Sequence, residues 1–157
     1  GAPVWQTLLD IDALAAAENA NWVFQGGDCL EGTTRCMIFL SDGGRDANTA
    51  REFDIATGRF VEGGFVVPEA KSTVSWLDED TLLVGTNWGD GSLTESGYAM
   101  IIKRWRRGTP LASATEVLRG QPAHVGVFTG ALQDVDGTRI PVATISEPFF
   151  ESSHWRR

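Results

Sequence analysis

The chain has 157 residues, a length typical of one domain, and a compact globule of this size buries roughly 70% of its unfolded surface. Its 13 Lys and Arg against 21 Asp and Glu give a net charge of -8, which disfavours nucleic acid as a partner. No apolar run approaches the roughly 20 residues that span a bilayer, and no basic flank precedes an apolar stretch at the N-terminus. We therefore expect no membrane span and no signal peptide in this sequence.

The first element expected in chain order is a short helix. The segment LLDIDALAAAEN (residues 8–19) is rich in alanine, and Asp12 is placed to cap a turn and a half of helix. We interpret residues 1–19 as a segment that leads into the first strand, since it is too short for a domain.

Three apolar runs favour strands, because they are β-branched or aromatic and too short for a typical helix. They are CMIFL (36–40), TLLVGT (81–86) and VGVFTGAL (125–132). An Asp-Gly pair follows each run, and these pairs recur at intervals of 48 and 46 residues, at 42–43, 90–91 and 136–137. Asp-Gly tolerates the positive φ angles of tight turns, and a period of this length is typical of four-stranded propeller blades.

Two hairpins are expected, one between the first and second runs and one that ends in the second run. TAREFDIATGRFVEGGF (49–65) alternates around Thr57-Gly58, with Phe53 and Ile55 on one face and Phe60 beyond the turn. TVSWLDEDTLLVGT (73–86) places three acidic residues, 78–80, in its turn. With 18 glycines and 6 prolines, the chain is predicted to be all-β.

The expected fold is a partial β-propeller of about three antiparallel four-stranded blades, in residues 20–157. The turn period divides it into blades at roughly 20–67, 68–120 and 121–157.

Cys29 and Cys36 are spaced neither as a zinc site nor as a redox motif. With only His124 and His154 elsewhere, and with no further oxygen ligands after DVDG (134–137), we expect no metal site. The sequence does not distinguish a disulfide between Cys29 and Cys36 from two free thiols, because the bridge requires an oxidising compartment. The sequence leaves that compartment open, cytoplasmic or periplasmic.

No catalytic group is evident. None of the nine serines lies in a G-x-S-x-G elbow, and Ser41, Ser92 and Ser96 are interpreted as loop residues. Glu52 and Asp54 alternate on a strand, where salt-bridge partners are commoner than catalytic carboxylates. We expect no catalytic, cofactor or metal residues in this chain.

The basic segment KRWRRG (103–108) is interpreted as the end of a strand. On a strand, Lys103, Trp105 and Arg107 share one face and Arg104 and Arg106 the other. We expect its arginines to pair with carboxylates of neighbouring strands and to stack on Trp105, while a binding patch remains the alternative.

The segments REFDIATG, GGF-x-x-PEAKS, W-x-D-x-DTLLVGT and KRWRRGTPL occur in this order between Trp5 and Gly120. This string resembles the N-terminal β-propeller of bacterial prolyl oligopeptidase family serine peptidases. After His124 the resemblance weakens, so the third blade depends mainly on the turn period.

The resemblance implies a two-domain parent, in which a seven-bladed propeller caps an α/β-hydrolase domain and restricts access to short peptides. In that family the catalytic triad follows the propeller, and Ser92, His124 and His154 match none of its motifs. The chain is thus expected to be an inactive fragment whose partners are peptides and the hydrolase domain.

A free-standing β-repeat module that binds proteins is the alternative. As a truncated fragment, a partial propeller leaves apolar faces uncovered at its two ends, so we expect it to self-associate into a symmetric dimer, through a contact that has no counterpart in the intact enzyme.

Overall fold

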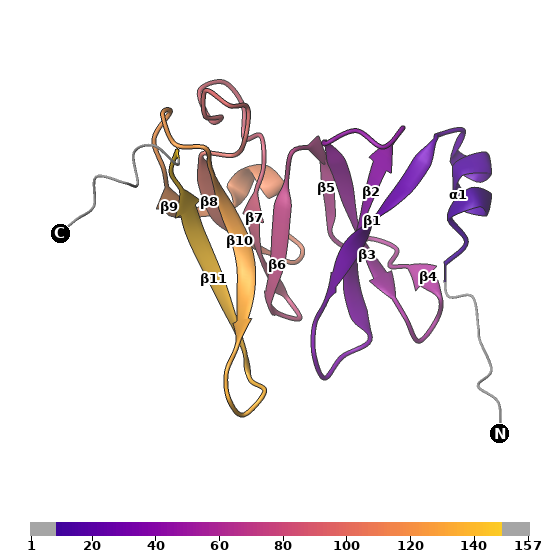
Figure 1. Ribbon diagram of the computed structural model, residues 1–157. Coiled ribbons are helices and arrows are strands. Elements are labelled where there is room, and N and C mark those ends of the chain that lie inside the picture. The colour runs from indigo at the N-terminus through magenta and orange to yellow at the C-terminus, as the bar shows by residue number, and fades with distance from the viewer. Residues whose placement is uncertain (1–8, 149–157) are drawn as a thin grey trace.

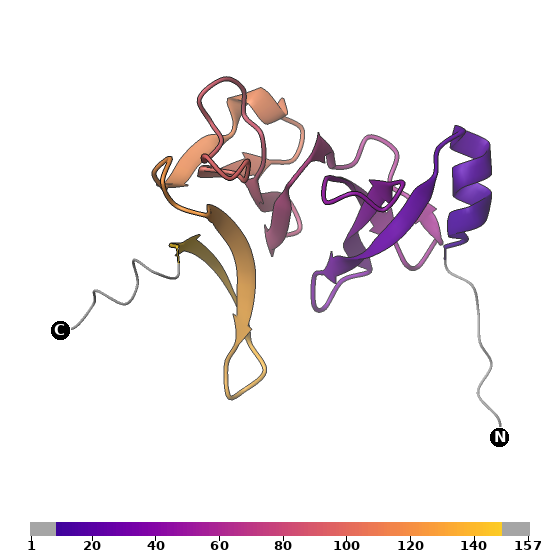
Figure 2. The same cartoon turned by 45° about the horizontal axis from the view of Figure 1, so that its top comes forward.

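The computed structural model describes residues 9–148, which form one short α-helix, one 3-10 turn and eleven strands in three antiparallel sheets (Figure 1). The expected all-β partial propeller is confirmed. The sheets follow one another along the array, with the helix at one end and the last two strands at the other (Figures 1 and 2).

The first sheet holds five strands: β1 (Trp22–Cys29), β2 (Arg35–Asp42), β3 (Asn48–Asp54), β4 (Arg59–Phe60) and β5 (Val66–Ala70). β4 and β5 pair with successive parts of the same edge of β3, so this sheet is four strands wide. The predicted hairpin at Thr57-Gly58 is confirmed, because Phe53 lies opposite Phe60 across that turn.

The second sheet has the order β6 (Thr73–Asp78), β7 (Thr81–Gly85), β8 (Ile101–Arg106) and β9 (Thr115–Arg119), with the 3-10 turn η1 (Leu111–Ser113) before β9. The predicted β6–β7 hairpin is confirmed, and the backbone N–H of Asp80 donates to the Asp78 carboxylate at 2.8 Å within its turn.

The third sheet differs from the expected four strands. In the described part of the chain it consists of β10 (Gly126–Gln133) and β11 (Arg139–Ser146) alone. β11 ends two residues before the last described residue. The blade limits expected from the turn period stay a prediction.

The helix α1 (Ile11–Glu18) forms where expected, but its cap was wrongly predicted. Asp10 is the N-cap, since it has extended backbone angles and accepts the Ala13 N–H at 3.0 Å. Asp12 lies in the first turn, where its charge favours the helix dipole. Glu18 ties the helix to the first sheet through an ion pair of 3.0 Å with Arg51.

The glycines of all three Asp-Gly pairs have positive φ angles, as the turn prediction requires: Gly43 (76°), Gly91 (77°) and Gly137 (88°). Gly137 lies in the turn of the β10–β11 hairpin. Asp90-Gly91 lies instead within the long connection between β7 and β8, residues 86–100, so this pair does not close a tight hairpin.

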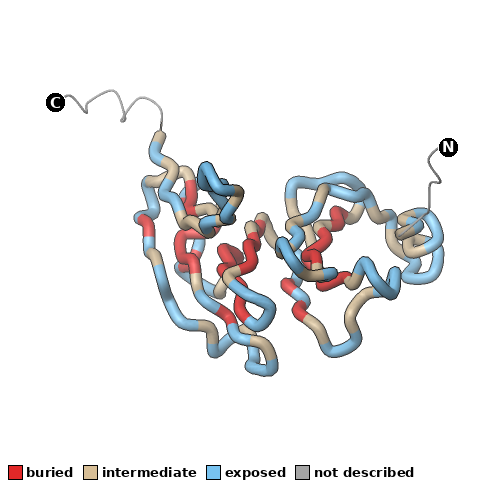
Figure 3. Tube along the Cα trace, turned by 90° about the horizontal axis from the view of Figure 1, so that it is seen from below, coloured by how far each residue is buried: buried red, intermediate tan, exposed pale blue. Residues whose placement is uncertain are grey.

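The cores lie between the sheets. Met37 and Phe65 of the first sheet pack against Trp76 and Trp105 of the second. Val127 of β10 packs against the other face of the second sheet. Buried segments run through the middle of the sheets and the connecting loops are mostly exposed (Figure 3). Each sheet therefore depends on its neighbour for burial of its apolar face.

Candidate functional site

The basic segment 103–108 is part of the core on one face. Trp105 is 7% exposed, and its ring meets the Phe65 ring edge to face at 4.8 Å. Its indole N–H donates to the Thr109 carbonyl at 2.8 Å. Arg104 and Arg106 on the opposite face are exposed. The tryptophan thus anchors β8, as a structural interpretation of this segment requires.

The expected stacking of arginines on Trp105 is wrong. The Arg107 guanidinium lies 4.5 Å from the centre of the Phe65 ring, and the Lys103 ammonium lies 4.6 Å from that of Trp88. Trp105 is packed among apolar side chains between the two sheets, so its faces are not free for a cation.

The expected pairing of an arginine with a carboxylate is found at Glu52. Its side chain is fully buried, and Arg107 of the neighbouring sheet holds both carboxylate oxygens, at 2.8 and 3.0 Å. Arg35 donates to the same carboxylate at 2.8 Å, and so does the Phe65 N–H at 3.0 Å. We call Arg35, Glu52 and Arg107 the buried ion cluster.

Burial alone would raise the pKa of Glu52, but the hydrogen bonds from Arg107, the Phe65 N–H and Arg35 outweigh it and lower that pKa below its ordinary value. The hydrogen bonds that Arg107 donates to the Glu52 carboxylate raise the pKa of Arg107. Both groups are therefore held in their charged forms, and the buried ion cluster joins two sheets, with Asp80 as a second carboxylate for Arg107 at 3.1 Å.

A second cluster joins all three sheets through residues of β1, β6 and β11, each of which has a single hydrogen-bonded neighbour strand in the described chain. The Trp76 backbone N–H donates to the Asp28 carboxylate at 3.2 Å, and its indole N–H donates to the Asp28 carbonyl at 2.8 Å. Arg139 donates to the Trp76 carbonyl at 2.6 Å and to the Asp28 carboxylate at 2.8 Å. We call Asp28, Trp76 and Arg139 the inner latch.

Beside the latch, a hollow of about 290 Å³ opens between the sheets. Its polar lining includes Gln25, Asn48, Thr73 and Thr129. The Thr129 N–H donates to the Thr73 hydroxyl at 2.9 Å, so β10 and β6 are joined there as well. We call the surface along β1, β6 and β10 the inner wall. Both polar and apolar side chains line its hollow, and hydrogen bonds join its sheets.

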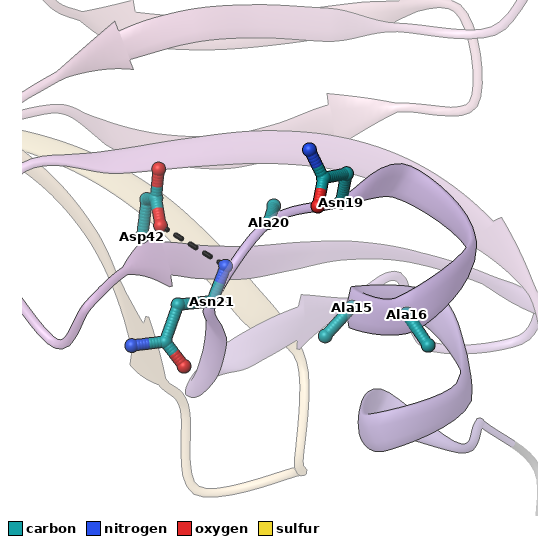
Figure 4. Close-up of a pocket in the computed structure, with 6 residues that line it drawn as sticks. All are labelled: Ala15, Ala16, Asn19, Ala20, Asn21 and Asp42. Carbon is teal, nitrogen blue, oxygen red and sulfur yellow. Dashed lines mark hydrogen bonds between the residues drawn. The ribbon is translucent and has the colours of Figure 1, made fainter.

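Two other hollows lie at the helix end. One, lined by Ala15, Ala16, Asn19, Ala20, Asn21 and Asp42, contains small side chains and a hydrogen bond of 3.1 Å from the Asn21 N–H to Asp42 (Figure 4). The other is apolar and lies over the first sheet, lined by Leu9, Ile11, Phe24, Cys29, Cys36, Ile38, Phe53 and Ile55. Neither contains a serine or a histidine.

The two cysteines form a disulfide, with an S–S distance of 2.02 Å. Cys29 and Cys36 are directly opposite each other on β1 and β2. This resolves the alternatives that the sequence left open in favour of the bridge.

Two of the serines considered above have structural partners, and Ser41 lies within β2, not in a loop as expected. The Ser41 hydroxyl donates to the Arg45 carbonyl at 2.7 Å, and the Ser92 hydroxyl donates to the Gly89 carbonyl at 2.6 Å. Ser96 is exposed. The His124 ring accepts the Gln121 N–H at 2.8 Å, and in residues 9–148 no hydrogen bond joins this histidine to a serine. His154 lies outside the described residues.

The described residues contain no group of three or more His, Cys, Asp or Glu side chains placed to hold a metal ion. They also contain no helix long and apolar enough to cross a bilayer. The arrangement that the described chain does offer is a wall of three sheets joined by hydrogen bonds.

The chain is similar to bacterial peptidases. It is 52% identical over 138 residues to the uncharacterized peptidase y4nA of Sinorhizobium fredii, and 26% identical over 139 residues to an uncharacterized peptidase of Rickettsia prowazekii. These alignments cover 87% and 83% of this chain but 19% of each relative. The chain thus spans about a fifth of the length of the curated relatives it matches.

A solved structure shows the same fold. A post-proline cleaving enzyme from Rickettsia typhi matches 95% of this chain, over 23% of its own, with a TM-score of 0.85 and 23% identity. The family profile for the prolyl oligopeptidase N-terminal beta-propeller domain matches residues 1–148. The chain therefore belongs to the prolyl oligopeptidase family, as a part of its N-terminal β-propeller domain.

Proposed function

We propose that this chain is a non-catalytic part of the propeller which, in a longer parent peptidase, restricts the access of peptides to an α/β-hydrolase domain. The observation that carries the proposal is the inner latch, through which Asp28, Trp76 and Arg139 join three consecutive sheets. A wall that excludes folded proteins must not separate between its sheets, and charge-assisted hydrogen bonds are suited to prevent this.

The chemistry of the inner wall supports the same role. Hydroxyl and amide side chains such as Gln25, Thr73 and Thr129 line the hollow beside the latch. Such groups can exchange hydrogen bonds with a passing peptide backbone without holding it tightly. The parent's substrates are short peptides on this proposal, and its catalytic groups lie outside this chain.

The test uses the full-length parent. Its reading frame is expected to continue past Arg157 into a G-x-S-x-G segment followed by Asp and His. The purified parent should cleave a short proline-containing peptide and spare the same sequence inside a folded protein. Replacing Arg139 by Met should raise cleavage of long substrates relative to short ones, with Arg119→Met, at an exposed ion pair, as the matched control.

Three results would contradict the proposal. A stop codon directly after Arg157 would favour the free-standing binding module. Equal cleavage of folded and short substrates by the parent would remove the gating role. An unchanged preference for length in the Arg139→Met parent would show that the inner latch does not contribute to it.

We also propose that the isolated chain pairs with a second copy in a symmetric dimer. Its two ends expose apolar side chains that the described residues do not cover, such as Phe24 (53% exposed) beside α1 and Leu132 (62% exposed) on β10. A second copy is the simplest cover for such surface. The catalytic domain and further blades of the parent would replace this contact.

A further inference from the structure

The disulfide lies in the short part of β1 that follows a bulge. The register of β1 against β2 shifts between Phe24 and Gly27, and Gly26 in that bulge has a φ of 103°. Beyond the bulge, β1 continues for the residues Gly27, Asp28 and Cys29 alone, opposite Ile38, Met37 and Cys36. A bulge leaves a residue unpaired and interrupts the ladder, so this tip is held by its own pairings, by the covalent bond and by the bonds of Asp28 to the other sheets.

The same tip carries the inner latch. Asp28 directly precedes Cys29. Its carboxylate accepts hydrogen bonds from the Trp76 N–H and from Arg139, and its carbonyl accepts one from the Trp76 indole. Trp76 lies in the core between the first two sheets, fully buried. A displacement of the tip of β1 is therefore transmitted directly to the contacts among all three sheets.

The bridge is open to attack from one side. Cys29 is exposed to solvent, whereas Cys36 is 2% exposed. Attack by a thiolate from solvent is therefore expected at the sulfur of Cys29, with Cys36 as the leaving thiolate. Both cysteines also line the apolar hollow over the first sheet, where movement of the Cys29 side chain meets no second sheet.

We propose that the Cys29–Cys36 disulfide is a reversible thiol modification site that controls the inner latch. A dithiol reductant attacks Cys29 Sγ and forms a mixed disulfide, while Cys36 leaves as a thiolate and takes up a proton. The second thiol of the reductant then displaces Cys29, so that the protein gains two electrons and two protons and the reductant becomes a disulfide. With the bridge open, the tip of β1 detaches more often and releases Trp76 and Arg139.

The test follows amide exchange in the isolated chain before and after treatment with dithiothreitol, with iodoacetamide labelling to count thiols. The oxidised chain should show no labelled cysteine and the treated chain two. The Trp76 N–H, which donates to Asp28, should exchange about tenfold faster after reduction, as expected for loss of a hydrogen bond to a charged group. Amides of β7 and β8 serve as the internal control and should change little.

Two variants separate the latch from general loosening. The double variant Cys29→Ser/Cys36→Ser should exchange at the Trp76 N–H as fast as the reduced chain, with or without dithiothreitol. Asp28→Ala, which keeps the bridge but removes the carboxylate, should exchange fast in both states, with Asp46→Ala as the control for loss of an acidic residue.

Several outcomes overturn the proposal. Two labelled thiols before reduction would show that the bridge does not form. Slow exchange at the Trp76 N–H in a fully reduced chain would show that the bridge does not support the latch. A response to reduction in Asp28→Ala equal to that of the unmodified chain, or equal acceleration throughout β7 and β8, would show that the effect does not pass through Asp28.

Discussion

Asp28 and Arg139 are 111 residues apart in the chain, and a bond of 2.8 Å joins the carboxylate of one to the guanidinium of the other. Asp28 belongs to the first sheet and Arg139 to the third. Both residues also bond to the backbone of Trp76 in the second sheet: Asp28 accepts its N–H, and Arg139 donates to its carbonyl. The side chains are 27% and 16% exposed, so the bond is partly shielded from water. The bond therefore holds the β10–β11 hairpin, which forms a sheet of two strands in the described chain, against the first sheet.

Replacing Arg139 by Met should lower the free energy of unfolding by about 2 kcal/mol, because it removes a charge-assisted hydrogen bond and leaves the Trp76 carbonyl without that donor. Urea denaturation followed by tryptophan fluorescence measures this. Arg119→Met is the matched control, since its pair with Glu116 is exposed to solvent and should contribute little to stability. Equal losses in the two variants would mean that the inner latch contributes no more than a surface pair.

Replacing Trp105 by Ala should destabilise the chain by about 3–5 kcal/mol, since it opens a cavity between the first two sheets. The melting temperature should fall accordingly, whereas Arg104→Ala, an exposed change one residue away, should leave it within a degree or two. An unchanged melting temperature in Trp105→Ala, together with lost binding to an anionic ligand, would instead identify segment 103–108 as a binding patch.

The buried ion cluster should make stability depend on pH in the acid range. The pKa of Glu52 is lowered in the folded chain, so the unfolded chain binds its proton first as the pH falls below the ordinary value of 4.5. The stabilisation by Glu52 is therefore complete above that pH and is lost as the pH falls through the folded-state pKa.

Glu52→Gln tests this dependence. At neutral pH it should cost about 3 kcal/mol or more, because Arg107 and Arg35 lose their carboxylate. The difference in unfolding free energy between the unmodified chain and Glu52→Gln should shrink below pH 4.5, with Glu95→Gln as an exposed control. A difference that stays constant from pH 7 to pH 3 would contradict the assignment.

The strands and hairpins could be predicted because their signals are local. Residues 49–65 and 73–86 alternate in the period of a strand and carry their own turn residues. The helix cap was mistaken because Asp10 and Asp12 both precede apolar residues, and the choice depends on the extended backbone at Asp10. The strand period placed Trp105 on a face with Ile101 and Lys103 but could not show which sheet covers that face.

The inner latch could not be predicted, for a different reason. Asp28, Trp76 and Arg139 lie on three sheets, and no spacing in the sequence relates them. Their contacts exist only after the sheets pack, and a single sequence contains no signal for such distant pairs. The carboxylate Glu52 was recognised as a salt-bridge partner, but its burial between sheets likewise depends on tertiary packing.

The isolated chain should not hydrolyse prolyl peptides, because the described residues contain no serine bonded to His124 and the family's triad follows the propeller. Purified protein is assayed with a proline-containing chromogenic peptide, and parallel samples carry Ser92→Ala and Ser96→Ala. Turnover that survives both changes would reveal another site, whereas turnover abolished by one of them would show that this loop serine is a nucleophile.

Self-association should depend on the two uncovered ends of the array, where apolar side chains meet solvent. Leu132 and Ile140 lie opposite each other on the outward face of the β10–β11 hairpin, and both are exposed. Replacing both by Lys should convert the dimer to a monomer of 17.0 kDa in light scattering at micromolar concentration, since like charges would then meet across a symmetric contact. Val135→Lys, in the fully exposed turn of the same hairpin, should leave the dimer intact.

If the hairpin is not the contact, Phe24→Lys at the other end should produce the monomer instead. A sharply folding monomer of the unmodified chain that binds no hydrophobic dye would contradict self-association outright, because the apolar ends would then need no cover.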